Sequence, residues 1–459
     1  MTLRSMVSAN DLFHRYLTEA IGAENAAVAL SALDEPASVS VRLNPDKFPG
    51  RLKDAVFPGS EPVPWSGCGL MIPERPVFTL DPFFHAGCYY VQDSSSMFVG
   101  HALRRVLGMM PHEGCPRVLD LCAAPGGKTT DAAASMRSVL GGGFLLVSNE
   151  VIRQRASVLA SNVAVWGDPQ VMVTSADPAE FGKIGAFFDI IMADVPCSGE
   201  GMFRKDAGAV EQWSAENVGH CAARQRRILA DVWPSLAEGG FLIYSTCTFN
   251  SYENDANVRW AMDELGAEAV RLDEAHVTDG VIETGYGYSL VPGFVKGEGQ
   301  YCAVLRKTSG SRRADVPHGR KRIPAQGAAA LFGMDVREVL KGDLIKVLPE
   351  SAADGMEYLE SRVSVISSGC AVGRRKGKDM VPDADLALDI CLGDDAFPRA
   401  EVDRMTALKF LHRDAVTLPG AEKGFVLVCH EGVPLGFVKN LGSRCNNLHP
   451  QERRIRMDI

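Results

Sequence analysis

The chain has 459 residues, of which 46% are hydrophobic and 23% are charged, and this composition excludes a disordered chain. The length predicts two or three domains. A formal net charge of -9 excludes the overall basicity of a protein that coats nucleic acid, although a local basic face would still allow RNA to bind. No apolar run approaches the ~18 residues of a membrane span. The first twenty residues lack the basic and apolar pattern of a secretory signal, so we expect a cytoplasmic protein.

The twelve cysteines are scattered along the chain. They form no CxxC pair, and no paired histidines have the spacing of zinc ligands, so no metal site is predicted. In the cytoplasm we expect them to stay reduced, and most of them to be small buried side chains.

The N-terminal part is predicted to form a small α+β domain over residues 1–85. Its proline-rich segment, between about residues 58 and 76, is typical of loops that lead into a larger domain. The next predicted element is a helix over residues 93–106, which Asp93 would cap.

The following part, residues 86–307, alternates short apolar runs with amphipathic stretches. This pattern is typical of a parallel sheet covered by helices on both faces. The predicted helices include residues 151–165 and 222–236. Five runs are predicted as buried strands: residues 117–121 (RVLDL), 144–148 (FLLVS), 171–174 (VMVT), 188–193 (FDIIMA) and 241–245 (FLIYS). We therefore predict an α/β fold with a doubly wound, mostly parallel sheet.

After this core, the polar and basic residues 308–322 predict a linker. Residues 323–459 contain short apolar runs between turn signals, such as 424–429 and 434–438, which predict a small domain rich in strands. Basic clusters occur near residues 306–313, 320–322, 374–378 and 453–456, and each is interpreted first as solvated surface charge.

Three strand ends in the core carry polar motifs. LCAAPGGK at 121–128 follows the first strand and precedes a helix, so its backbone can approach a ligand, but it has neither Walker A nor GxGxxG spacing. Glu150 follows the second strand and Asp177 follows the third. In doubly wound sheets such acids bind ribose hydroxyls or an adenine edge, although either one alone is interpreted as a helix cap. Together they predict a bound nucleoside.

The fourth and fifth strands each end at a cysteine. Residues 194–199 read DVPCSG and residues 245–248 read STCT, so Cys197 and Cys247 reach the ligand-binding edge of the sheet together with Asp194. A thiolate that adds to carbon 6 of cytosine turns carbon 5 into a nucleophile, provided that an acid disperses charge at N3. The residues alone leave open which cysteine attacks.

As a set, these motifs resemble the NOL1/NOP2/Sun family of RNA cytosine-5 methyltransferases. The matching segments are LCAAPGGK, Asn149-Glu150, DVPCSGEGMFRK at 194–205 and STCTFN at 245–250, with VRLNP at 41–45 and YVQDSSSM at 90–97 upstream. The resemblance covers nearly all of the first 307 residues. It implies a Rossmann-like class I methyltransferase core, S-adenosylmethionine as the cofactor and RNA as the partner, with no membrane and no obligate protein partner.

The resemblance also implies residue roles. Cys247 would be the nucleophile, Cys197 would assist product release, and Asp194 would stabilise the activated cytosine. In DNA cytosine-5 methyltransferases the cysteine after the proline, matched here by Cys197, attacks instead, so the assignment depends on the family. The implied cofactor site comprises Cys122, Ala123, Ala124, Pro125, Gly126, Gly127, Lys128, Glu150 on the ribose, Arg155, Asp177 near the adenine, and Asp194.

The C-terminal stretches at 381–388 and 435–456 resemble the PUA-like RNA-binding tail of bacterial enzymes that methylate 16S rRNA near the decoding site. NNLHP at 446–450 departs from the more basic, aromatic ending typical of that subgroup, and Gln300 and Tyr301 replace two common aromatics, which implies a local difference in packing. Arg42 and Asn44 are expected either to clamp RNA or, in the case of Arg42, to tie two domains together by ion pairs. A transfer RNA substrate and an RNA-binding assembly factor without turnover remain as alternatives.

Overall fold

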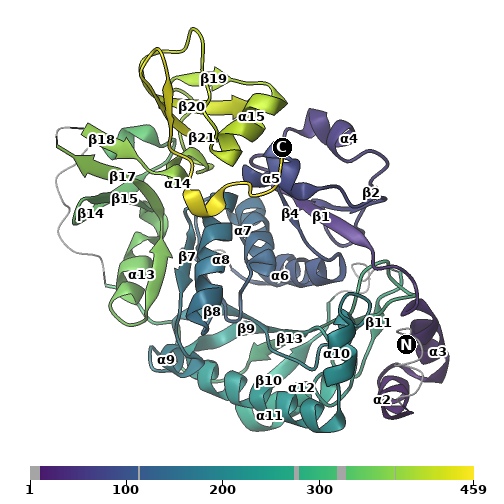
Figure 1. Cartoon of the computed structure of the whole chain (residues 1–459). Coiled ribbons are helices and arrows are strands. Elements are labelled where there is room, and N and C mark those ends of the chain that lie inside the picture. Colours follow the sequence, from purple (N-terminus) through teal and green to yellow (C-terminus); the bar gives the residue numbers. More distant parts are fainter. Residues whose placement is uncertain (1–10, 112–113, 273–278, 318–326, 378) are drawn as a thin grey trace.

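The computed structural model describes residues 11–111, 114–272, 279–317, 327–377 and 379–459. Its centre is a ten-stranded sheet in the order β11-β12-β13-β9-β8-β5-β6-β7-β16, with β10 paired to β13 (Figure 1). Five neighbouring strands are parallel: β5 (Arg117–Asp120), β6 (Leu145–Asn149), β7 (Val171–Thr174), β8 (Phe188–Asp194) and β9 (Leu236–Thr246). The chain runs outward from β5 through β6 to β7 and returns on the other side of β5 through β8 to β9. The doubly wound prediction is confirmed, and the reversal lies between β5 and β8.

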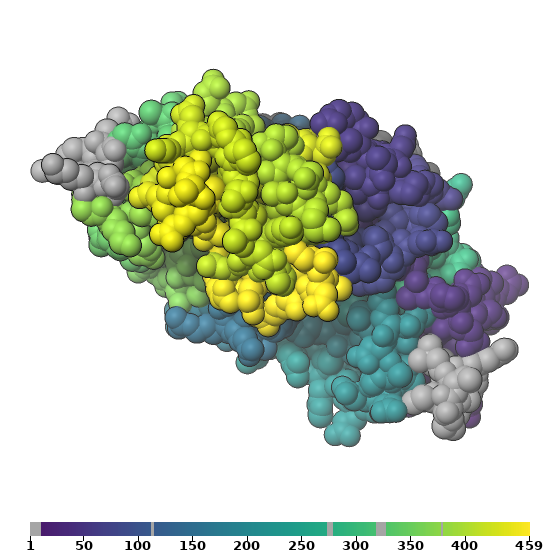
Figure 2. Space-filling model, turned by 45° about the horizontal axis from the view of Figure 1, so that its top comes forward, coloured from purple at the N-terminus to yellow at the C-terminus, as the bar shows by residue number. Residues whose placement is uncertain are grey.

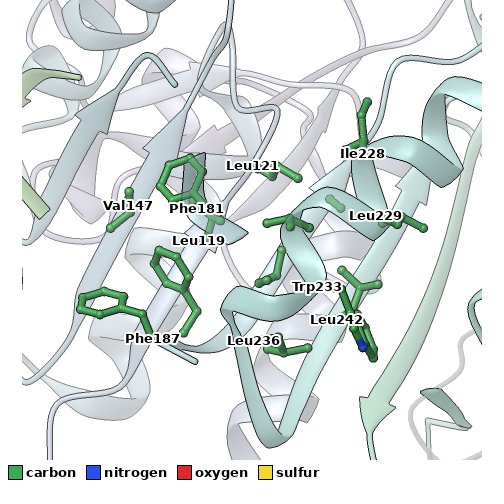
Figure 3. Packing of buried hydrophobic residues seen from close by; sticks show 14 of the residues in the cluster. Leu119, Leu121, Val147, Phe181, Phe187, Ile228, Leu229, Trp233, Leu236 and Leu242 are labelled. Carbon is green, nitrogen blue, oxygen red and sulfur yellow. The ribbon is translucent and has the colours of Figure 1, made fainter. Parts of the chain in front are cut away.

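Helices cover both faces of this sheet because successive strand residues point to opposite sides. In β5, Val118 packs in the apolar cluster of α6 (Phe98–Met109), α7 (Gly127–Leu140) and α8 (Arg153–Trp166). Its neighbour Leu119 packs in the opposite cluster, with Phe181 of α9 (Pro178–Gly182) and Leu229 of α11 (Ala215–Val232), as Figure 3 shows.

Two predicted helices have wrong boundaries. Ser214 caps α11 by accepting a hydrogen bond from the Asn217 N–H at 3.1 Å, so α11 begins seven residues before the predicted start at 222 and ends at Val232; Leu236 already belongs to β9. Asp93 accepts a hydrogen bond from the Ser95 N–H at 3.0 Å and so begins a 3₁₀ turn, Ser95–Met97, that precedes α6.

The N-terminal region divides into two parts. Helices α2 (Asp11–Ile21) and α3 (Ala23–Ala32) pack beside α10 (Ala207–Gln212), where Phe13 contacts Phe203 and Trp213. The rest forms a sheet in the order β2-β3-β1-β4, from β1 (Val39–Leu43), β2 (Glu61–Pro62), β3 (Gly69–Ile72) and β4 (Tyr89–Val91). Figure 2 shows this N-terminal part, in purple, directly beside the C-terminal residues in green and yellow.

The C-terminal region is rich in strands, as predicted. One sheet contains β14 (Val336–Lys341), β15 (Leu344–Pro349), β17 (Cys370–Lys376) and β18 (Asp379–Pro382). The other contains β19 (Arg399–Glu401), β20 (Gly424–His430), β21 (Val433–Asn440) and β22 (Cys445–Asn447), and it packs against α15 (Arg404–His412).

Part of the C-terminal region is built into the central sheet and its apolar core. Strand β16 (Val365–Ser368) pairs antiparallel with β7 and so covers one edge of the central sheet. Helix α13 (Glu350–Glu360) places Met356 and Leu359 in the same apolar cluster as Leu119 of β5.

The described part of the predicted linker runs along the core surface. Arg313 donates a hydrogen bond to Asp189 at 2.8 Å, and Arg117 donates one to the carbonyl oxygen of Ala314 at 3.0 Å. The Lys307 ammonium is buried and donates to the carbonyl oxygens of Trp233 and Leu236, so it is a structural cation. Residues 318–322, with one of the basic clusters, lie outside the described residues. Within the described ranges, no helix has the length and apolar character needed to cross a membrane.

Three regions of the chain meet at the C-terminal end of α8, here called the α8 junction. Asn44 donates to the carbonyl oxygen of Trp166 at 3.1 Å, and the Lys47 ammonium donates to that of Val165 at 2.7 Å. From the C-terminal region, the N–H of Ile390 donates to the carbonyl oxygen of Gly167 at 3.0 Å. These bonds satisfy carbonyl groups that have no partner within the helix.

Arg42 lies buried at the same junction. It is 1% exposed, donates to Gln92 at 2.8 Å and to Thr130 at 2.5 Å, and stacks 4.6 Å from the ring of Trp166. Its Nε also lies 3.9 Å from the Asp131 carboxylate. The interpretation of Arg42 and Asn44 as an RNA clamp is therefore wrong, because both side chains are buried between domains. The ion-pair alternative for Arg42 is correct.

Candidate active site

The loop after β5 is held from both sides. The N–H of Ala123 donates to the carbonyl oxygen of Asn149 at 2.8 Å, which ties the loop to the end of β6. From α8, Asn162 donates to the carbonyl oxygen of Pro125 at 2.7 Å and Arg155 donates to that of Ala124 at 3.1 Å. Gly126 has a φ of 116°, and a Cβ there would lie 3.2 Å from Leu159, so glycine is required where the loop turns into α7.

The predicted cofactor acids lie at the ends of neighbouring strands. Glu150 is 3% exposed; it accepts a hydrogen bond from the Ile152 N–H at 3.0 Å, and its other oxygen lies 3.2 Å from Arg155. Asp177 is exposed after β7 and caps α9 by accepting a hydrogen bond from the Ala179 N–H at 3.0 Å. The structure therefore brings Glu150, Arg155 and the loop together, with Asp177 one strand further along the same edge.

Asp120 is a site residue that the sequence analysis missed. It ends β5 and is fully buried; one carboxylate oxygen accepts a hydrogen bond from Thr129 at 2.7 Å, and Oδ1 has no partner among the residues that the structure describes. Burial, with a smaller contribution from Asp194, raises the pKa of Asp120 to about 7 although Thr129 opposes the shift. The available signal was its position, because it is an acid at the end of the first parallel strand.

The two predicted cysteines are in contact. Cys197 follows β8 and Cys247 follows β9, and their Sγ atoms lie 2.9 Å apart. The N–H of Cys247 also donates to the sulfur of Cys197 at 3.3 Å. The hydrogen bond to Cys247, together with burial, raises the pKa of Cys197 well above its usual value. Cys197 therefore keeps its proton at neutral pH.

Asp194 and Lys128 form an ion pair beside the cysteines. The ammonium lies 2.9 Å from Oδ2 of Asp194, while Oδ1 accepts a hydrogen bond from Ser245 at 2.8 Å. Burial lowers the pKa of Lys128, but Asp194 and Cys247 outweigh burial and the net pKa is raised, so the cation is stable here. Gln300, expected to change only local packing, donates to the carbonyl oxygen of Thr246 at 2.9 Å and reaches within 3.4 Å of Asp194.

The two cysteine loops are joined by a reciprocal pair of carboxylates, here called the carboxylate clasp and consisting of Glu200 and Glu253. Glu200, three residues after Cys197, accepts hydrogen bonds from the N–H groups of Phe249 at 2.7 Å and Asn250 at 3.0 Å, just after Cys247. Glu253, on the Cys247 side, accepts one from the Ser198 N–H at 3.1 Å. Each loop therefore holds the backbone of the other and fixes the separation of the two sulfur atoms.

Asn250 connects the two carboxylates. Its amide donates to Glu200 at 3.0 Å and to Glu253 at 2.9 Å, and Gln225 donates to Glu253 at 2.7 Å from α11. Burial raises the pKa of Glu253, although the hydrogen bonds that it accepts oppose the shift. The sequence analysis quoted Glu200 and Asn250 inside motifs but assigned no role to either of them or to Glu253, because most of their partners lie far away in the sequence.

Two further observations concern the cysteine thiols and possible metal ligands. All twelve cysteines are free thiols. Across the described ranges, no cluster of three histidine, cysteine, aspartate or glutamate side chains is suited to hold a metal ion.

Family models match three parts of the chain. The model described as 16S rRNA methyltransferase RsmB/F matches residues 106–306, and the N-terminal domain of 16S rRNA methyltransferase RsmF matches residues 10–94. The methyltransferase RsmF PUA domain matches residues 397–455. Curated relatives named ribosomal RNA small subunit methyltransferase F include one from Shewanella sp. (strain W3-18-1), 30% identical over 92% of both chains, and one from Shewanella sp. (strain MR-7), 31% identical over the same shares.

Solved structures with the same core come from Pyrococcus horikoshii. A methyltransferase homolog protein has a TM-score of 0.55 and 25% identity, and the match covers 66% of this chain and 98% of that one. NSun6 with SFG has a TM-score of 0.53 and 20% identity over 65% of this chain and 98% of its own, which is a likeness of fold.

Proposed function

Because this chain belongs to the RsmB/F family of 16S rRNA methyltransferases, we propose that it methylates carbon 5 of a cytosine in 16S rRNA, near the decoding site, with S-adenosylmethionine as the donor. The observation that carries this proposal is the pair of sulfur atoms 2.9 Å apart, with the Asp194–Lys128 ion pair beside them. We further propose that the protein acts in the cytoplasm.

The residues at the carboxyl edge of the sheet fit the cofactor. Glu150 is placed to accept hydrogen bonds from ribose hydroxyls and Asp177 from an adenine amine, while the loop from Cys122 to Lys128 would lie against the rest of the molecule. The unpartnered Oδ1 of Asp120 is an acceptor that suits a ligand ammonium group. S-adenosylmethionine, when bound, supplies an electrophilic methyl group.

The chain's own residues divide the remaining chemistry. The Cys247 thiolate forms a bond to carbon 6 of cytosine, and the displaced electron pair moves toward N3. Asp194, taking a proton from the Lys128 ammonium paired with it, donates the hydrogen bond that disperses this charge. Carbon 5 then accepts the methyl group and afterwards loses its proton to a base, while the bond between carbon 6 and sulfur breaks. The family resemblance assigns the attack to Cys247, and the sulfur of Cys197, 2.9 Å away, is close enough to donate a hydrogen bond to the departing sulfur.

RNA must present the cytosine outside a helix to reach these groups. A base within a duplex has to be flipped out, so we propose an unpaired or locally opened target. We also propose that residues 1–85 and 323–459 bind RNA on either side of the catalytic residues 86–307, with residues 308–322 connecting them.

Bisulfite sequencing of 16S rRNA from cells with and without the protein tests this proposal. We expect one or a few cytosines near the decoding site to lose protection in its absence, and expression of the wild-type chain, but not of a Cys247→Ala variant, to restore it. If protection in 16S rRNA is unchanged and protection in transfer RNA is lost, transfer RNA is the substrate instead of 16S rRNA. Unchanged protection in both, with no methyl transfer from labelled cofactor to either RNA, would favour an assembly factor and overturn the proposal.

A further inference from the structure

A cavity of about 850 Å³ lies at the α8 junction, apart from the two cysteines. The N-terminal sheet region, α8 and the C-terminal region all contribute to its lining, so no single domain contains it. Aromatic rings line it: Phe84 and Tyr90 are half-buried and keep exposed surface, whereas Phe78, Tyr89 and Trp166 are buried behind them. Its volume falls within the ~300–1,000 Å³ typical of ligand sites.

The C-terminal wall presents two polar atoms without partners. His449 is 6% exposed and its Nε2 has no hydrogen-bond partner within the described ranges. Arg453 pairs with Asp385 at 2.7 Å, but within those same ranges its buried Nη1 has none. Because buried polar atoms are normally paired, each of these two nitrogens is a candidate hydrogen-bonding group for a ligand in the cavity. His449 belongs to the NNLHP segment that departs from the usual ending of the subgroup.

The cavity also adjoins the cofactor loop. Tyr90 and Asn162 line it, and both donate to the carbonyl oxygen of Pro125, at 3.3 Å and 2.7 Å. At the exposed rim, the Arg75 guanidinium lies 5.4 Å from the ring of Phe78. The cavity thus combines aromatic faces, two unpaired polar atoms and a cation within reach of solvent.

We propose that this cavity binds an unpaired nucleotide of the substrate RNA, adjacent to the segment that carries the target cytosine. Aromatic faces stack any nucleobase, and proteins that recognise single-stranded RNA hydrogen-bond the edges of splayed bases, a role suited to His449 and Arg453. The Arg75 cation is suited to a phosphate. The inference rests on the proposed function insofar as RNA is the substrate, and it adds a second RNA contact away from the reacting base.

The test fills the cavity without altering the cofactor loop. Ser161, half-buried on α8, lines the cavity, whereas Val158, one turn earlier, is 50% exposed and does not line it. Steady-state kinetics on a 16S rRNA fragment containing the methylated cytosine compare Ser161→Trp with the control Val158→Trp. We expect Ser161→Trp to raise KM for RNA by about tenfold, the loss of one stacked base, while kcat and KM for the cofactor stay within about twofold. Val158→Trp should match the wild type, and thermal melting verifies that both variants fold.

A second measurement uses the unaltered protein. The same RNA fragment carrying 4-thiouridine beside the target cytosine is photo-crosslinked, and the protein peptides are identified by mass spectrometry. Crosslinks to the peptides that contain Tyr89, Tyr90 or Trp166 support the proposal. They should disappear from Ser161→Trp and persist in Val158→Trp.

The outcomes separate this inference from the proposed function. If the wild type methylates the fragment but Ser161→Trp keeps its KM, or crosslinks avoid the cavity peptides, the cavity holds no RNA and only the inference fails. If free 4-thiouridine monophosphate crosslinks to the cavity peptides while the RNA fragment does not, the occupant is a small molecule, and the inference is again overturned. If the wild type methylates no RNA at all, the proposed function itself fails.

Discussion

The catalytic edge and the α8 junction use buried polar groups in opposite ways. At the catalytic edge the carboxylate clasp is saturated, because both oxygens of Glu200 and both of Glu253 accept hydrogen bonds. At the junction, within the described part of the chain, His449 and Arg453 each keep a buried nitrogen without a partner. A network in which every polar group is hydrogen-bonded fixes the geometry of the site. A network with unpaired polar groups becomes more stable when a ligand bonds to those groups. The clasp is thus a rigid scaffold, whereas the junction has the unsatisfied groups that the proposed nucleotide site requires.

The largest expected effect comes from the sulfur pair. Cys247→Ala should lower methyl transfer by at least ~10³-fold and abolish any covalent RNA adduct, because no nucleophile remains. Cys197→Ala should also lose turnover but accumulate the adduct, because only release is impaired. Denaturing gel shifts of labelled RNA measure the adduct. An adduct that forms with Cys247→Ala and not with Cys197→Ala would show that the two roles are exchanged.

The second-largest effect is expected from substitutions in the carboxylate clasp. Glu200→Gln keeps the side-chain volume but removes a charge that accepts two backbone N–H bonds, and charged hydrogen bonds of this kind contribute ~1.5–3 kcal/mol. We expect kcat to fall by about 10- to 100-fold, with KM for the cofactor within about threefold, because the sulfur atoms lose their alignment while the loop after β5 is untouched.

Exposed Glu180 provides the matched control, and Glu180→Gln should behave like the wild type. A double-mutant cycle with Glu253→Gln adds a readout that a purely structural role would not move. Strongly non-additive losses in kcat would support a coupled clasp. A fall in kcat that is accompanied by a matching fall in the melting temperature would instead show that Glu200 acts only by stabilising the fold.

Motifs at strand ends made the catalytic edge predictable, since Cys197, Cys247 and Glu150 each come within a few residues after an apolar run. The clasp was not predictable, because most of the groups that Glu200 and Glu253 bind lie far away in the sequence, as Ser198 does from Glu253, and only the folded chain brings them close. The contacts of the predicted linker with the core could not be predicted, because polarity along the sequence cannot reveal that Arg313 meets Asp189, 124 positions away. Strand β16 was not predicted, because its four residues, VISS, show little apolar pattern. They form a strand because they pair with β7 of the central sheet.

At the junction, Arg42→Met should separate domain tying from RNA binding. Burial lowers the pKa of Arg42. Removing this cation leaves the buried Asp131 carboxylate with Arg104, 3.8 Å away, as its remaining cation in place of two. We therefore expect the free energy of unfolding to fall by about 3 kcal/mol. Arg51, whose ion pair with Glu431 is exposed, provides the control, and Arg51→Met should change it by no more than about 0.5–1 kcal/mol. Urea denaturation measures both. If Arg42→Met lowers RNA affinity but leaves the free energy of unfolding unchanged, Arg42 contacts RNA and the clamp interpretation is correct after all.

The smallest expected effect is a pH dependence of the C-terminal wall. Burial, beside His85, Arg413 and Arg453, lowers the pKa of His449 to about 4. Between that pH and the unfolded pKa near 6.5, only the unfolded chain binds the proton, so stability present at pH 7 is lost as the pH falls. We expect His449→Gln to remove about 1–2 kcal/mol of the loss between pH 7 and pH 5, measured as the difference between the two urea denaturation curves. Parallel stability profiles would mean that His449 is solvated and the cavity wall is open.

The pairing of β16 with β7 has a consequence for how the chain emerges during synthesis. The parallel strands are complete by Thr246, yet the open edge of β7 is covered only when Ser368 is made, more than a hundred residues later. An uncovered strand edge invites pairing with another chain. A nascent chain of this protein is therefore most prone to aggregate over that interval. We therefore expect truncation at residue 307 to leave the edge of β7 uncovered permanently.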